Sequence, residues 1–148
     1  CKPHSRRNKQ QNEEKQFQSY HFLFNFDFFN DFIILGGTGG RFEHTFANIS
    51  IMARASMQGN QITIVDDKHI FRAITDSKIK IPYSPNKQIS VFAFGDKAYG
   101  VYETGFHYLL SDYTLDPFIP IGISNDIIDD FGEISVKKGT LIIIETIV

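Results

Sequence analysis

Residues 32–60, FIILGGTGGRFEHTFANISIMARASMQGN, decide the fold of the first part of the chain. The stretch begins with an apolar run, 32–35, that ends at a glycine and is typical of a buried strand in a parallel sheet. Glycine then occupies four of the five positions 36–40. From residue 42 onward, apolar side chains recur with the helical period, which predicts an amphipathic helix that ends near Gly59. The stretch is therefore predicted to form a strand, a glycine-rich turn and a helix.

The sequence changes to a period of two after this helix. Short alternating segments are separated by Gly, Pro, Asn and Asp turn signals, with no helical period between them. The strand candidates are 62–67, 69–75, 78–83, 88–94, 97–104, 106–110, 133–138 and 140–148. Such a series predicts an antiparallel sandwich or barrel. We therefore divide the chain into a partial α/β domain, 17–59, and an all-β domain, 60–148.

The residues before the first strand differ from both domains. Residues 1–16 contain five basic and two acidic side chains and almost no apolar ones, so we expect a disordered or atypical tail. A basic tail can bind RNA, although a solvated chain end explains so few charges as well. Residues 17–31 are rich in phenylalanine, and their spacing fits either a helix or a strand. Because residue 1 is Cys rather than Met, we expect the chain to be a fragment.

The composition argues against several functional classes. The chain has 148 residues, of which 42% are hydrophobic and 22% charged, as in an ordinary folded protein. Its net charge of -2 argues against a broad nucleic-acid-binding face, and its single cysteine excludes an internal disulfide or a cysteine-based zinc site. No apolar run reaches the roughly 18 residues that span a bilayer. The sequence thus predicts a soluble, cytoplasmic protein without a nucleic-acid or membrane partner.

The glycine-rich turn is the first candidate site. Glycines allow a ligand to approach the backbone closely, and the free N–H groups of a helix start attract phosphate. Arg41 stands at that helix start and can hold phosphate or carboxylate through its guanidinium. The spacing matches neither the P-loop nor the dinucleotide-binding motif. A simple tight turn between strand and helix explains the glycines equally well.

Polar residues beside this turn and near residue 124 are further candidates. Glu43 can bind a metal or an amine, or can merely compensate the helix dipole. His44 can act as a base or contact a ligand, although a lone histidine is often structural. Ser124 and Asn125 end an apolar segment, where they can bind a ligand or form an ordinary turn. Adjacent carboxylates such as Asp66 and Asp67 are interpreted as solvated turn residues.

Four segments resemble a known family in order and spacing. GGTGGRFEHTFANI, residues 36–49, resembles the GGxGGRxDHxLANI signature of thiamine pyrophosphokinases. TGFHYLL at 104–110 is similar to the family's GLKYPL segment, and GISN at 122–125 to its GISNE segment. EISVKKGTLIIIETI at 133–147 resembles the family's last hairpin. The resemblance covers residues 33–148 and extends back toward Phe17.

The resemblance implies both a fold and an activity. The fold is an α/β fragment, the last strand–helix unit of a Rossmann-like catalytic domain, followed by an all-β antiparallel sandwich that binds thiamine. The activity is transfer of pyrophosphate from ATP to thiamine, which gives thiamine diphosphate and AMP with Mg²⁺ as cofactor. Family members are homodimers in which thiamine lies between the catalytic domain of one subunit and the sandwich of the other.

The resemblance also implies residue roles. The implied catalytic residues are Arg41, Glu43 and His44. The implied thiamine-binding residues are Ser124, Asn125 and His44. The implied nucleotide- and phosphate-binding residues are Gly37, Gly39, Gly40 and Arg41.

Two departures from the family pattern keep other functions open. Glu43 stands where the family has aspartate, and the segment before Phe17 does not match the family's metal-binding carboxylates, which lie upstream of the glycine motif. We therefore expect no metal ligand within this chain. The alternatives are a non-catalytic thiamine-binding module or pseudoenzyme, and a β-sandwich interaction domain without a ligand.

Overall fold

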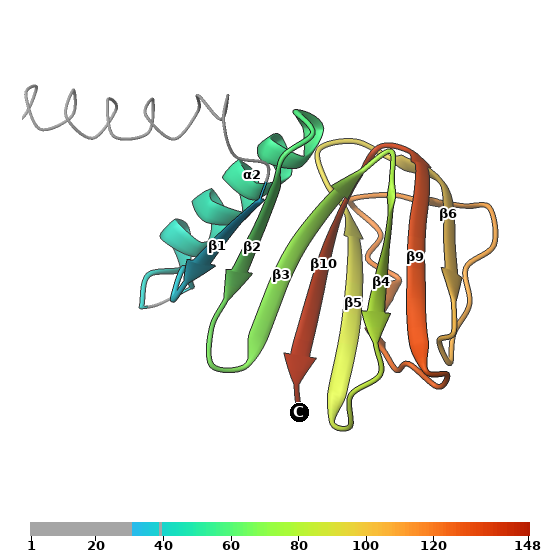
Figure 1. The fold of residues 1–148 in the computed structure, drawn as a ribbon. Coiled ribbons are helices and arrows are strands. Elements are labelled where there is room, and N and C mark those ends of the chain that lie inside the picture. The colour runs from blue at the N-terminus through green and yellow to red at the C-terminus, as the bar shows by residue number, and fades with distance from the viewer. Residues whose placement is uncertain (1–30, 39) are drawn as a thin grey trace, which may run out of the picture.

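The computed structural model describes residues 31–38 and 40–148. The expectations for residues 1–30 and for Gly39 lie outside these residues. The elements are one helix, α2, and ten strands (Figure 1). Their bounds are β1 (Asp31–Leu35), α2 (Phe42–Met57), β2 (Gln61–Val65), β3 (His69–Thr75), β4 (Lys78–Pro82), β5 (Lys87–Ala93), β6 (Ala98–Thr104), β7 (Tyr113–Leu115), β8 (Gly122–Asn125), β9 (Phe131–Lys138) and β10 (Thr140–Ile147).

The strands form two sheets. One has six strands in the order β1-β2-β3-β10-β5-β8, and the other has four in the order β4-β9-β6-β7. Strand β1 pairs with β2 in parallel, from Asp31 opposite Gln61 to Leu35 opposite Val65. Every other strand pair of the described residues is antiparallel. The helix α2 crosses over from β1 to β2, as a parallel connection requires.

The six-stranded sheet is covered on its two faces by different layers. On one face, Met52 of α2 packs with Ile64 of β2 and Ile142 of β10. On the other face, Leu141 and Ile143 of β10 join a core that is shared with the four-stranded sheet. Successive side chains of a strand point to opposite faces. Strand β10 is therefore buried on both sides, which explains why its sequence is almost continuously apolar.

The helix has the predicted extent and end. It begins after Arg41, whose backbone is extended, and it ends at Met57. Beyond it, the backbone N–H of Asn60 donates to Ala55 O at 3.0 Å, and Gly59 has a φ of +82°. These bonds use carbonyl groups that the last helical turn leaves unpaired. No helix of the described residues is long and apolar enough to cross a membrane.

Three details of the strand predictions are wrong. Residues 106–110 are not a strand, because only Phe106 forms an isolated bridge, with Ile127. The short strands β7 and β8 were not predicted. Strand β2 pairs antiparallel with β3, as expected, but its other neighbour, β1, runs parallel to it, so this sheet is not antiparallel throughout. The six-stranded sheet runs through the position where we divided the chain. The domain division and the Rossmann-like assignment stay predictions, because the described residues contain a single β–α–β unit.

Candidate functional site

The glycine-rich turn lies at the carboxyl ends of the parallel strands β1 and β2. The N–H of Gly36 donates to Val65 O at 2.8 Å, and the side-chain amide of Asn48 on α2 donates to Gly37 O at 2.8 Å. A Cβ at Gly37 would lie 2.9 Å from the Cγ2 of Ile64, so this position requires glycine for close packing. The turn is thus held from both the strand and the helix. In open α/β sheets, ligands bind at this edge.

Asp66, which follows β2, fixes the turn from a third side. Its carboxylate accepts hydrogen bonds from the Thr38 hydroxyl and from the backbone N–H groups of Lys68, at 2.8 Å, and His69, at 2.7 Å. Burial acts to raise the pKa of Asp66, but these hydrogen bonds outweigh it and lower the pKa to about 2. A surface hollow is lined by Gly36, Thr38, Asp66, Asp67, Lys68 and His69. Asp66 is therefore a partner of the glycine turn rather than a solvated turn residue.

Replacing Thr38 by valine is expected to raise the pKa of Asp66, because one of the bonds that stabilise its charged form is lost. The free energy of unfolding at neutral pH should fall by about 1–2 kcal/mol. The stabilisation from this carboxylate is present above its unfolded pKa and disappears as pH falls toward about 2. NMR titration of the Asp66 carboxyl measures the shift, with Thr38→Ser as the control that keeps the hydroxyl. An unchanged pKa in Thr38→Val would contradict the assigned bond.

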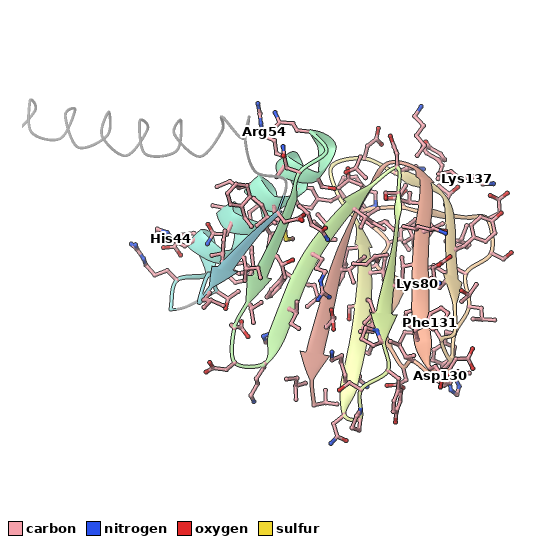
Figure 2. All side chains as sticks on the ribbon, in the orientation of Figure 1. His44, Arg54, Lys80, Asp130, Phe131 and Lys137 are labelled. Atoms are coloured by element: carbon pink, nitrogen blue, oxygen red, sulfur yellow. The ribbon has the colours of Figure 1, made fainter. Side chains whose placement is uncertain are left out.

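The three predicted catalytic residues lie together at the start of α2. The Nε of Arg41 is 3.8 Å from Glu43 Oε1, and His44 Nε2 is 4.0 Å from the same oxygen. Arg41 and Glu43 are exposed, and His44 is half-buried at the outer end of the helix (Figure 2). The described part of the chain has no group of three or more His, Cys, Asp or Glu side chains that could hold a metal ion. Glu43 is the one carboxylate among these three residues, so this cluster by itself offers a cation a single carboxylate ligand.

The second predicted pair, Ser124 and Asn125, lies on β8 beside the 106–110 segment. The Asn125 side-chain amide donates to Tyr108 O at 2.7 Å, and its oxygen accepts from Tyr108 N at 3.0 Å. His107 N also donates to Asp126 O at 2.8 Å. Two motifs that are well separated in sequence are therefore joined through one side chain. The backbone pairing of Phe106 and His107 with residues 126 and 127 therefore stops at Tyr108, whose backbone pairs with a side chain instead.

Ser124 and Asn125 differ in accessibility. Asn125 is buried, and its amide is fully used by protein groups. A direct bond from Asn125 to a ligand would require one of these bonds to break. Ser124 is exposed, and its φ of +56° lies in the left-handed region that non-glycine residues seldom adopt. Such strain is common at binding sites, where surrounding contacts hold it in place.

Exposed apolar side chains lie on β8 and on the segment that Asn125 joins to it. Ile123 is exposed, and so are Tyr108 and Leu109, with 69% of Tyr108 accessible. The rings of His107 and Tyr108 lie 4.7 Å apart. This surface, which we call the β8 face, is formed by residues 107–109, 123 and 124. It offers one hydroxyl and two rings to a flat ligand.

The glycine turn and the β8 face are far apart within the chain. Strands β1 and β8 are the two edges of the six-stranded sheet, separated by five strand spacings. At about 4.8 Å a spacing, this is roughly 24 Å. Figure 2 likewise shows His44 at the opposite side of the molecule from Phe131, whose backbone oxygen lies against Gly105, the residue before the 106–110 segment. The structure thus brings the predicted residues together in two clusters, not in one.

Sequence reasoning missed two residues that support these clusters. Asp66 was treated as solvated, because a contact with Thr38 across 28 positions leaves no local pattern. Glu103 of β6 was not singled out, yet its carboxylate accepts from the Asn125 amide at 2.9 Å. A signal for Glu103 did exist. It shares a strand face with the apolar Val101, so an acid was placed toward the core.

Comparisons with known proteins agree with one another. Residues 76–141 match the family model described as thiamin pyrophosphokinase, vitamin B1 binding domain. Thiamine pyrophosphokinase of Bacillus subtilis (strain 168) is 29% identical over 114 residues, which cover 76% of this chain and 53% of that protein.

Two solved structures are similar to the chain. The crystal structure of the Bacillus subtilis thiamine pyrophosphokinase has a TM-score of 0.74 at 28% identity and covers 79% of this chain and 55% of that one. The crystal structure of the Geobacillus thermodenitrificans thiamin pyrophosphokinase has a TM-score of 0.70 at 24% identity and covers 78% of this chain and 54% of that one. At this identity the similarity supports a shared fold and nothing further. The chain thus spans about half the length of these relatives. The chain is similar to the C-terminal part of thiamine pyrophosphokinases.

Proposed function

We propose that this chain forms the thiamine-binding part of a thiamine pyrophosphokinase. One observation carries the proposal: Asn125 joins the TGFHYLL and GISN segments into the β8 face, inside the region that matches a vitamin B1 binding domain. Folding alone does not require an exposed ring on one of these segments and a strained, exposed serine on the other. A binding surface accounts for both.

The chemistry of thiamine fits the β8 face. Thiamine has a flat aminopyrimidine ring and a positively charged thiazolium ring. The exposed Tyr108 ring can stack on the first or attract the second through its negative face. The Ser124 hydroxyl can both donate to and accept from the pyrimidine nitrogens. The buried amide of Asn125 contributes by holding this surface in shape.

The glycine turn is proposed to bind the phosphates of ATP. The backbone at Gly36, Gly37 and Gly40 and the first N–H groups of α2 can surround an anion, and Arg41 adds a positive charge. His44 and Glu43 stand beside this position. Transfer of pyrophosphate to thiamine, with Mg²⁺ as cofactor, is proposed only for a protein that also contains the part of the relatives that this chain does not match.

We further propose that the site is completed between two subunits of a homodimer. The hydroxyl of thiamine must reach a phosphorus atom of ATP, but the two clusters lie roughly 24 Å apart across the sheet. A second copy can place its β8 face against the glycine turn of the first. Light scattering at high protein concentration is expected to give a dimer mass, and a monomer mass would contradict this arrangement.

Replacing Ser124 by alanine is expected to weaken thiamine binding by about tenfold, because one hydrogen bond to the ligand is lost. Asp96→Ala is the matched control, since Asp96 is exposed in the turn after β5 and belongs neither to the β8 face nor to the hollow beside the glycine turn. Titration with thiamine compares the two variants. Equal affinities for Ser124→Ala and Asp96→Ala would show that the β8 face is not the binding surface.

A non-catalytic thiamine-binding module is the second candidate. The specific observation in its favour is that the described residues do not assemble a metal-binding carboxylate cluster. Thiamine binding without formation of thiamine diphosphate, in a protein that includes the remaining part of the relatives' fold, would favour the module. An interaction domain without a ligand would show no thermal stabilisation by thiamine.

A further inference from the structure

Glu103 is an acid in the core of the sandwich. It lies on β6 with 3% of its surface exposed, opposite Ile134 of β9. Its Oε2 accepts from Asn125, and its Oε1 has no hydrogen-bond partner among the described residues. Burying a carboxyl group with an unpaired oxygen costs free energy that a leucine there would avoid. The stability of the core therefore does not explain an acid at this position.

The Glu103 carboxyl contributes to the orientation of the Asn125 amide. The Nδ2 of Asn125 donates to Glu103 Oε2, at 2.9 Å, and to Tyr108 O, at 2.7 Å. Its Oδ1 accepts from the backbone N–H groups of Tyr108 and Asp126. A flipped amide would point its oxygen at the carboxyl of Glu103 and its NH₂ group at the N–H of Tyr108. Only the observed orientation matches every partner.

The segment after β6 depends on this amide. Its ends are joined by a bond from the backbone N–H of Glu103 to Leu110 O, at 3.0 Å. Between these ends, Tyr108 uses both its backbone N–H and its C=O on the Asn125 side chain. Tyr108 belongs to no strand. Its backbone is therefore held beside β8 by one buried amide.

We infer that Glu103 is a positioning residue of the thiamine site: its buried carboxyl helps to fix the Asn125 amide, and the amide fixes the Tyr108 backbone beside β8. The inference rests on the proposed thiamine binding and adds a residue that touches no ligand. The property that matters is the acceptor oxygen at position 103, not the negative charge. Glutamine at this position can supply that oxygen, whereas leucine fills a similar space without it.

The test compares Glu103→Leu with Glu103→Gln in the whole chain. Glu103→Leu is expected to weaken thiamine binding by about tenfold or more, because the Asn125 amide loses a partner and Tyr108 loses its fixed position. Glu103→Gln is expected to stay within about twofold of the unchanged chain. Should Glu103→Leu not fold, Glu103→Met removes the acceptor with a more flexible side chain.

Amide hydrogen exchange gives a readout that does not need the ligand. The Tyr108 amide is expected to exchange about tenfold faster in Glu103→Leu and at an unchanged rate in Glu103→Gln. The control is Ile64→Ala, a core substitution beneath α2 that lowers stability without touching Asn125. After correction for its global stability, it should leave both Tyr108 exchange and thiamine affinity unchanged.

The outcomes separate this inference from the proposed function. Unchanged Tyr108 exchange in Glu103→Leu would overturn the inference, as would a Glu103→Gln variant that is as impaired as Glu103→Leu. If the unchanged chain binds no thiamine, the proposed function fails. The exchange rates then still decide whether Glu103 positions Tyr108.

Discussion

Replacing Gly105 by alanine is expected to lower the free energy of unfolding by about 3 kcal/mol or more. Gly105 has a φ of +80°, and a Cβ at this position would lie 2.2 Å from the backbone oxygen of Phe131. A backbone atom cannot rotate away as a flexible side chain can. The variant must therefore separate the 105–110 segment from the start of β9. Urea denaturation measures the loss.

Gly95→Ala is the matched control for this substitution. Gly95 has nearly the same backbone conformation, with a φ of +82°, but a Cβ there meets no atom within 4 Å. It should cost only the strain of the left-handed conformation, about 1–2 kcal/mol. Equal losses of stability in the two variants would show that the contact with Phe131 is not close in solution.

The stability of the unchanged protein is expected to fall as pH rises from about 5 to about 8. Burial raises the pKa of Glu103 to about 7, although the hydrogen bond from Asn125 acts to lower it. Because this pKa is above the unfolded value of 4.5, the fold favours the protonated form. The stabilisation is complete below the unfolded pKa and is lost as pH rises through the folded one. The total change is about 3 kcal/mol.

Glu103→Gln is expected to remove most of this pH dependence, because glutamine has no proton to lose in this range. At pH 8 the variant should therefore be more stable than the unchanged protein. Urea midpoints at several pH values between 5 and 8 measure the effect. Glu133→Gln, at the surface beside Lys78 and Lys80, leaves Glu103 in place and should keep the pH dependence. If the stability of Glu103→Gln falls with pH as steeply as that of the unchanged protein, another group causes the effect.

The sequence predicts well the elements whose pattern is local. The helical period from residue 42 onward gives α2 within about one residue, and the apolar run 32–35 gives β1. The 106–110 segment was mispredicted because its alternation is that of a strand, while both backbone groups of Tyr108, at its centre, bond to the Asn125 side chain. Strands β7 and β8 have only three and four residues, too few to show a period.

The candidate site could be predicted only in part, because some of its contacts join residues that are far apart in the sequence. Arg41, Glu43 and His44 are neighbours in sequence, so their proximity at the start of α2 follows directly. Ser124 and Asn125 are also neighbours, but a strand places adjacent side chains on opposite faces, so one is exposed and the other is buried. The buried face of β8 meets Glu103, and that contact depends on tertiary packing.

Titration calorimetry of the chain with thiamine, with and without Mg-ATP, tests the central claim most directly. The account predicts saturable binding of thiamine to the unchanged chain, and weaker binding to Ser124→Ala. It also predicts that binding does not require Mg-ATP, because the β8 face is built from residues of the sandwich. A folded chain that gives no binding heat at millimolar thiamine would contradict the account.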